Sequence, residues 1–277
     1  MLRTLLALAL LAAVAAGCAR SDPNTESSRP LNPGDGASYG ALIRVADATR
    51  QAGDLPGALS LYRRAAVANP SDAEPHVRIG QTLTDMRAYN EAIASYQWAL
   101  QLDPRNADAM RGWGHALIGL DQLAMAGTQY EAALGYNPND YRTMNGLGVI
   151  KDMQGDHSSA QAYYRRGLAI EPNSLALQNN LGLSLALSGN YAESIRILRV
   201  LAVNPGSTSR NRLNLALAYG LASQPDEAAR ASRNDLDALS IQRNLEYYAL
   251  LRSMEPQQRS SAIRNNPNYF PRGSGVQ

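Results

Sequence analysis

Histidines and closely spaced carboxylates are the side chains whose types could support catalysis or metal binding in this sequence. No two histidines share the i, i+3 or i, i+4 spacing that places metal ligands on one helix face. Asp152 and Asp156 could in principle act as an acid and a base, but helix caps and exposed turns explain such pairs more simply. No phosphate-binding glycine loop and no nucleophile elbow is present. We therefore predict no catalytic residue, no metal site and no cofactor, and we interpret the histidines as solvated helix positions: His76, His115 and His157.

The single cysteine, Cys18, is the residue best placed for covalent modification. It follows Met1-Leu2-Arg3 and an apolar run from Leu5 to Ala16, which together have the charged and apolar parts of an export signal. The apolar run is shorter than the roughly 20 residues that cross a bilayer. Having only one cysteine also excludes a fold stapled by disulfides.

The residues Ala15-Ala16-Gly17-Cys18 resemble a bacterial lipobox, whose cysteine is lipidated and becomes the mature N-terminus. Ala15 departs from that pattern, because lipoboxes more often carry leucine there. Cleavage after Ala13-Val14-Ala15 would instead leave Cys18 as a free thiol. The resemblance implies lipidation of Cys18 and firm anchoring by several acyl chains. Ala19 replaces the aspartate that retains enteric-type lipoproteins in the inner membrane, so the resemblance implies the periplasmic face of the outer membrane.

Small and aromatic residues recur along the chain at a spacing of 34. The small-residue series is Ala58, Ala92, Ala126, Ala160, Ser194 and Ala228, and the aromatic series is Tyr62, Tyr96, Tyr130 and Tyr164. This period and these residue types resemble the tetratricopeptide repeat, a helix-turn-helix unit. We therefore predict an all-α fold, a tetratricopeptide-repeat solenoid of about six helix-turn-helix units plus a C-terminal capping helix. The tyrosines should pack in its core.

Two further series indicate how each unit is built. Side chains that can cap a helix stand where each first helix should begin: Asp72, Asn106, Asp140 and Ser174. Glycines at the same period would each cost a helix up to about 1 kcal/mol relative to alanine. Close approach of paired helices would offset that cost. Helices this short are marginal alone, so we expect stacked neighbours to supply the stability.

The two ends of the array differ in composition from the repeats. An apolar stripe formed by Ile241, Leu245, Tyr248 and Leu251 predicts the capping helix. We predict a lipoprotein signal peptide at 1–17, a flexible tether at 18–38, the array with its capping helix at 39–254 and a disordered tail at 255–277. The net charge of +2, without a cluster of Lys or Arg among aromatic residues, excludes a nucleic-acid surface.

The first helices of a tetratricopeptide array line a groove that holds a peptide. Carried over by helix face, this groove would present Asp47, Gln81, Asp85, Arg111, His115, Arg142, Asn145, Asp152, Asn179 and Arg210. Their mixture of charges suggests a partner held by hydrogen bonds to its backbone, not a highly charged ligand. Asn145 and Asn179 are the first candidates, because each can donate and accept.

Some stretches carry a more specific resemblance than the repeat itself. After the lipobox they are Met144 to Val149, Asn179 to Gly189, Arg212 to Ala222 and Asn244 to Arg252. Their order resembles the TadD-like lipoproteins of the tight-adherence (Flp) pilus assembly system. The resemblance implies a non-catalytic, pilotin-like scaffold that aids the localisation or assembly of an outer-membrane secretin, with that secretin or another assembly component as partner. The alternative is a different periplasmic tetratricopeptide lipoprotein, either a type IV pilus pilotin or an envelope-synthesis cofactor.

Overall fold

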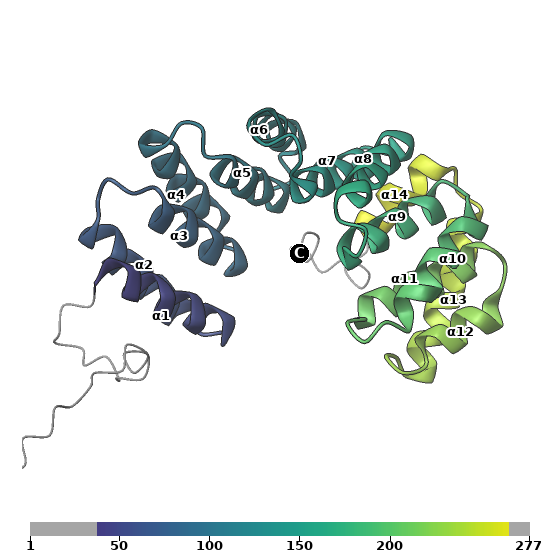
Figure 1. Ribbon diagram of the computed structural model, residues 1–277. Helices are drawn as coiled ribbons and strands as arrows, with labels where there is room; N and C mark the ends of the chain where they lie inside the picture. Colours follow the sequence, from purple (N-terminus) through teal and green to yellow (C-terminus); the bar gives the residue numbers. More distant parts are fainter. Residues whose placement is uncertain (1–37, 266–277) are drawn as a thin grey trace, which may run out of the picture. The chain divides into compact units, whose positions relative to one another are not determined.

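The computed structural model describes residues 38–265, and this part of the chain is helical with no strand (Figure 1). The predicted signal peptide, Cys18 and all of the tether but Ser38 lie outside the described residues. Six helical hairpins follow one another: α1 Tyr39–Gln51 with α2 Leu55–Ala68, α3 Glu74–Asp85 with α4 Tyr89–Leu102, α5 Ala107–Gly119 with α6 Leu123–Tyr136, α7 Tyr141–Met153 with α8 His157–Ile170, α9 Leu175–Leu187 with α10 Tyr191–Ala202, and α11 Ser209–Leu221 with α12 Pro225–Ser232. Helices α13 Ala238–Arg252 and α14 Pro256–Asn265 complete the described chain. The predicted all-α solenoid of six hairpins is confirmed.

Left-handed residues end the first helix of every hairpin. They recur every 34 residues and have φ between 59° and 91°: Gly53, Arg87, Asp121, Gly155, Gly189 and Ser223. A left-handed residue at this position closes a helix C-terminus and lets the chain reverse. Three of the six are not glycine, and each of those carries a conformational cost of roughly 1–2 kcal/mol. The capping series at the helix starts is also as predicted, with Asn106 accepting a hydrogen bond from the amide of Ala109 at 2.9 Å.

Tyr96 and Tyr130 each fill the space that two glycines leave. Tyr96 is 1 % exposed. A Cβ added to Gly80, in the same hairpin, would lie 2.6 Å from the Tyr96 ring, and one added to Gly112 of the next hairpin would also collide with it. The ring therefore packs against both first helices at once, which explains why glycine is present in helix interiors. The prediction that the tyrosine series packs in the core is confirmed.

The predicted capping helix is α13, and it places an aromatic ring against the last hairpin. Tyr248 of α13 is 1 % exposed, and its ring lies against Gly220 of α11. Residue 232 of α12, the position that continues the tyrosine series, is a small serine. The helix that covers the last hairpin therefore supplies a buried aromatic ring that α12 itself lacks.

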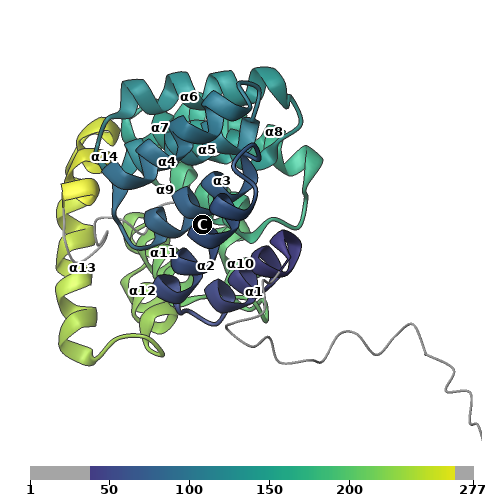
Figure 2. The same cartoon turned by 90° about the vertical axis from the view of Figure 1, so that its left-hand side faces the viewer.

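The prediction of a disordered tail from residue 255 is wrong for residues 256–265, which form α14. Arg259 anchors this helix: its Nε donates to the carbonyl oxygens of Leu251 and Met254, both at 2.9 Å, and its Nη1 donates to the Tyr191 hydroxyl at 3.0 Å. Ile263 is 2 % exposed. Helix α14 contacts α13, α9 and α7. Figure 2 shows α14 in yellow, continuing from the end of α13. The composition of this segment is polar, and contacts distant in sequence are what order it.

The helices of the array are short, with 8 to 15 residues each. Within residues 38–265, none has the length and apolar character required to cross a bilayer.

Candidate functional site

A groove of about 770 Å³ runs along the first helices of the hairpins. Its walls come from α1, α3, α5, α7, α9 and α11, together with the rings of Tyr96 and Tyr130, which reach it from the second helices. The groove therefore draws on all six repeats. A long cavity shared by successive first helices can hold an extended or helical segment along its length.

Arginines outnumber acidic residues in this groove. The charged side chains that line it are Arg50, Arg87, Arg111, Arg142, Arg210, Asp85 and Asp108. Burial lowers the pKa of His115, which also lines the groove, so this imidazole is neutral at pH 7 and adds no charge. The groove does carry both signs, as expected, but positive charges are in excess.

Two arginines at one end of the groove are held in ion pairs. Arg50 pairs with Asp85 at 2.6 Å. Arg111 pairs with Asp108 at 2.6 Å and with Asp140 at 2.7 Å.

Asp140, the cap of α7, is itself a tightly held carboxylate. Burial opposes its ionisation, but hydrogen bonds from Thr143 and Arg111 outweigh that effect and hold the pKa of Asp140 below its usual range. Arg111 therefore has a structural role, bracing α5 against the start of α7, in addition to lining the groove.

Four of the six principal predicted binding residues line the groove: Arg111, Arg142, Asn145 and Arg210. Asp152 and Asn179 do not contribute to its wall. That the four bind a partner stays a prediction, whereas the expected groove location of the other two is wrong.

Asp152 is held in a network inside the array. Its carboxylate accepts hydrogen bonds from the Ser184 hydroxyl at 2.7 Å, from the Tyr164 hydroxyl at 2.9 Å and from His157 Nδ1 at 2.7 Å. Only 17 % of its side chain is exposed. Burial, and then the adjacent Asp152 charge, raise the pKa of Tyr164 well above its ordinary value. These donors come from α8 and α9, so Asp152 joins two hairpins and uses most of its acceptor capacity inside the array.

Asn179 is the centre of a second internal network. Its Oδ1 accepts from Nδ2 of Asn211 at 3.0 Å and of Asn214 at 2.9 Å, and its own Nδ2 donates to Asn180 Oδ1 at 3.3 Å. Asn180 in turn donates to Asn145 Oδ1 at 2.9 Å. This chain of amides links α7, α9 and α11. Only its Asn145 end reaches the groove, where Nδ2 of that residue has no partner among residues 38–265.

Comparisons with known proteins agree with this architecture. Models of the tetratricopeptide repeat match residues 73–106, 111–173 and 152–209. The fold is a tetratricopeptide-repeat solenoid. Comparison with curated proteins found no match.

Three solved structures illustrate how widely this solenoid fold is shared. Pseudomonas aeruginosa pilF has a TM-score of 0.63 and 20% identity, covering 76% of this chain and 97% of its own. A tetratricopeptide protein from Parabacteroides merdae has a TM-score of 0.61 and 16% identity, with coverages of 79% and 87%. YrrB, described as having an unusual peptide-binding site, has a TM-score of 0.50 and 20% identity, with coverages of 66% and 97%. At these identities the likeness establishes the fold alone. Tetratricopeptide folds are typically non-catalytic scaffolds that bind protein partners.

A serine, a histidine and an aspartate meet where α14 packs on the tetratricopeptide array. His157 lies 2.7 Å from Asp152 through Nδ1 and 2.9 Å from Ser260 Oγ through Nε2. If Nδ1 carries the proton, Nε2 accepts from the serine hydroxyl. This is the order of groups in a nucleophilic triad. However, Ser260 is only 9 % exposed and lines neither the groove nor the smaller cavity between the turns that lead into α3 and α5. We assign the three residues to docking of α14.

The predicted solvation of the histidines is wrong for His157, which is 5 % exposed. The reason is that α14, placed in a disordered tail by sequence, covers it. His76 is half-buried, and its ring centroid lies 5.9 Å from that of Trp98.

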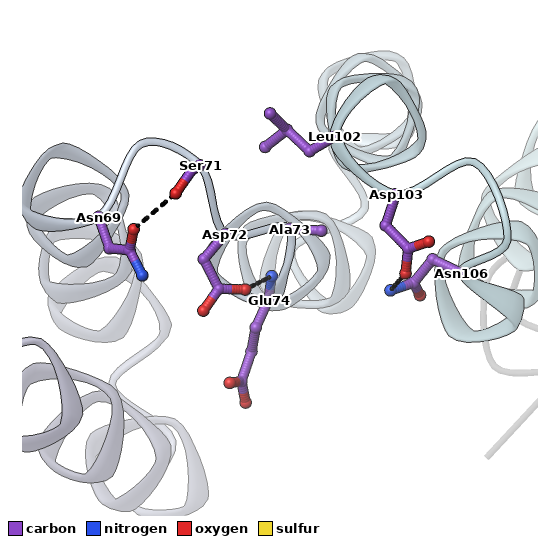
Figure 3. A pocket seen from close by; sticks show the side chains of 8 residues that line it. All are labelled: Asn69, Ser71, Asp72, Ala73, Glu74, Leu102, Asp103 and Asn106. Atoms are coloured by element: carbon purple, nitrogen blue, oxygen red, sulfur yellow. Dashed lines mark hydrogen bonds between the residues drawn. The ribbon is translucent and has the colours of Figure 1, made fainter.

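A smaller cavity of about 420 Å³ lies between the turns that lead into α3 and α5 (Figure 3). Its polar groups already bind one another. Asp72 accepts from the amide of Glu74 at 2.9 Å, and Asn106 donates to Asp103 at 3.1 Å. These contacts lie within the turns themselves, so this cavity offers a ligand fewer unused groups than the groove does.

Asp108 and Ala176 line the groove but were not among the residues predicted from the sequence, although the 34-residue period indicates them. Asp108 and Ala176 stand 34 residues before and after Arg142, a residue that was selected, and Arg210 continues the same series. All four line the groove. Applying the period to each selected residue would have found Asp108 and Ala176. Arg87 carries no such signal, because it lies in the turn between α3 and α4.

Proposed function

We propose that this chain is a lipid-anchored tetratricopeptide scaffold of the outer membrane, and that it holds a protein partner during assembly of a tight-adherence (Flp) pilus. The observation that carries the proposal is the groove of about 770 Å³, which is lined by first helices of all six hairpins. A cavity of this length, built by a rigid solenoid, serves to bind a segment of another protein.

Two features of the sequence support the membrane and pilus parts of the proposal. Cys18 follows an export signal in a lipobox-like context, which would attach the array to the membrane through acyl chains. The stretches from Met144 to Arg252 resemble the TadD-like lipoproteins in type and order. In this role the scaffold is pilotin-like, and the secretin of the system, or another assembly component, is its partner.

The test compares four strains. Three produce the wild-type chain, Cys18→Ser or Ser21→Ala, and the fourth has the gene for the chain deleted. Ser21→Ala is the matched control, since it changes a residue close to the cysteine without removing the thiol. Outer-membrane secretin multimers and surface pili should decrease in the deletion and in Cys18→Ser, and stay at the wild-type level in Ser21→Ala. Immunoblots must show equal amounts of the three chains.

Unchanged multimers and pili in both the deletion and Cys18→Ser would refute the proposal. Loss of the multimers of a different secretin, with Flp pili intact, would favour the type IV pilus alternative. Neighbouring genes for a prepilin peptidase, small Flp pilins and a secretion ATPase would support the tight-adherence assignment.

A further inference from the structure

We infer that the groove takes an acidic peptide segment, oriented so that its carboxylates lie at the α7–α11 end against Arg142 and Arg210. The inference deepens the proposed function, on whose groove it rests, by specifying the chemistry of the partner and its direction. It follows from how the charges are distributed along the groove, not from their total.

At the α1–α5 end of the groove, Arg50 and Arg111 are paired with carboxylates within the chain. Arg50 is occupied by Asp85 at 2.6 Å, and Arg111 is held between Asp108 and Asp140 at 2.6 and 2.7 Å. Recruiting either guanidinium to a ligand would require breaking an existing ion pair. A charged ligand gains little there.

The α7–α11 end is different. Neither Arg142 nor Arg210 pairs with a carboxylate anywhere in the described part of the chain, and both line the groove. The guanidinium of Arg142 lies 4.9 Å from the centroid of the Tyr141 ring, and this cation–π contact holds it over the aromatic face while leaving its edge for a ligand. Desolvation by the surrounding chain lowers the pKa of Arg210, so an anion at this position would offset the cost of the unpaired charge.

The position of these arginines in their helices also favours the binding of carboxylates at the α7–α11 end. Arg142 and Arg210 lie in the first turns of α7 and α11, and the first turn of α9 between them contributes Ala176. These three residues occupy one position of the repeat, 34 apart. Ala176 places neither a charge nor a long side chain between the two arginines. The positive ends of the helix dipoles add to the attraction of carboxylates.

Asn145 supplies a neutral contact beside these cations. Because its Oδ1 is occupied by Asn180 at 2.9 Å, the amide presents Nδ2 as a donor in the groove. A peptide backbone has carbonyl acceptors at regular intervals, so one of them can accept from this donor while neighbouring carboxylates bind the guanidinium groups.

The groove favours an acidic peptide over a nucleic acid or polyphosphate. Asp85 and Asp108 line the opposite end, where they pair with Arg50 and Arg111, so the phosphates of a polyanion would have to break these ion pairs to gain a cation from them. A peptide can carry its carboxylates at one end only and present backbone amides, which are donors, to the aspartates. The asymmetry of the groove therefore specifies both the ligand class and its direction.

The experiment measures binding of fluorescein-labelled peptides of about ten residues to the purified chain by fluorescence anisotropy. One probe alternates Glu and Ala, and the other has Gln in place of every Glu. The chain variants are Arg142→Gln/Arg210→Gln and a control double variant, Arg64→Gln/Arg166→Gln. The control has the same change in net charge on exposed residues of α2 and α8 that do not line the groove.

We expect the wild-type chain and the control to bind the Glu peptide, and to bind the Gln peptide at least about tenfold more weakly, since charge-assisted hydrogen bonds are the stronger ones. The groove variant should lose about tenfold or more in affinity for the Glu peptide, and that affinity should fall as salt is added. Circular dichroism should show the same helix content for all chains.

Three results would overturn the inference: equal binding of the Glu and Gln peptides, equal loss in the groove and control variants, or tighter binding of polyphosphate than of the Glu peptide. Direction is tested by peptides with all Glu residues in the N-terminal or the C-terminal half and a nitroxide at the acidic end. Broadening of NMR signals from α3 in place of α11 would refute the orientation. If the peptide experiments fail but secretin multimers still depend on Cys18, the acidic-peptide inference is refuted and the proposed function stands. Failure of the inference can therefore be distinguished from failure of the proposed function.

Discussion

Substituting Asp152→Ala should destabilise the array strongly, because Asp152 is part of an internal hydrogen-bond network. If Asp152 were instead a surface carboxylate of the groove, the same substitution would cost little. Three donors, from His157, Ser184 and Tyr164, would lose their common acceptor. A buried polar group left unsatisfied costs about 1–3 kcal/mol. Water would reach some of these groups, because 17 % of the Asp152 side chain is exposed. We therefore expect a loss of about 3–6 kcal/mol in the free energy of unfolding, against roughly 5–15 kcal/mol for a typical domain.

Urea unfolding followed by far-UV circular dichroism measures this loss, and a double-mutant cycle assigns it. Ser184→Ala alone should cost about 1 kcal/mol, and it should cost clearly less when Asp152 is already alanine, because the acceptor is gone. Asp226→Ala, at an exposed position of α12, is the matched control and should leave the transition unchanged. A change of less than about 0.5 kcal/mol for Asp152→Ala, or strict additivity with Ser184→Ala, would refute the network as a source of stability.

Three further predictions concern packing, acid stability and the docking of α14. Gly114→Ala should destabilise by about 1–3 kcal/mol, because the added Cβ would lie 2.8 Å from the Tyr130 ring. Gly127→Ala, where nothing lies within 4 Å, should stabilise by up to about 1 kcal/mol; urea unfolding measures both. The lowered pKa of Asp140 means that its stabilisation is present above about pH 4 and is lost as the pH falls through the folded-state value, so Asp140→Asn should flatten the decline of stability in acid measured between about pH 6 and pH 3. Ser260→Ala should accelerate amide hydrogen exchange in α14.

Each of these has a clear contrary outcome. Equal effects of the two glycine substitutions would mean that Tyr130 does not fix the spacing of the helices. An unaltered acid profile in Asp140→Asn would mean that its carboxylate is not specially stabilised. Exchange that rises equally in α14 and α1 after Ser260→Ala would indicate a general loss of stability in place of local release.

The repeat and its hairpins could be predicted because several kinds of residue recur with the same period. Capping residues, core tyrosines and glycines all recur at 34, so their positions agree about where each helix lies. The left-handed turns were not foreseen, since Arg87, Asp121 and Ser223 occupy three of them in place of glycine. Their conformation is imposed by the hairpin around them, and side-chain type alone does not reveal it.

The groove was predicted less well because position on a helix face does not decide how a polar side chain is used. Asn179 and Asn145 stand at one repeat position, and only Asn145 reaches the groove. The side chain of Asn179 instead accepts hydrogen bonds inside the array from Asn211 and Asn214 of α11. The repeat pattern does not predict these contacts. Arg111, Arg142 and Arg210 do line the groove as expected, whether or not a carboxylate pairs with them.

Helix α14 also has a mechanical consequence. In a solenoid whose hairpins contact only their neighbours, a stretching force peels hairpins away singly, in many small steps. Because α14 reaches from α13 across α9 to α7, the hairpins it spans cannot extend until it detaches. We expect the hairpins from α7 onward to rupture as one event with a single long extension, and those formed by α1 to α6 to yield in shorter steps. Under force, the part from α1 to α6 would therefore extend readily, and the part from α7 onward would resist extension until it ruptures.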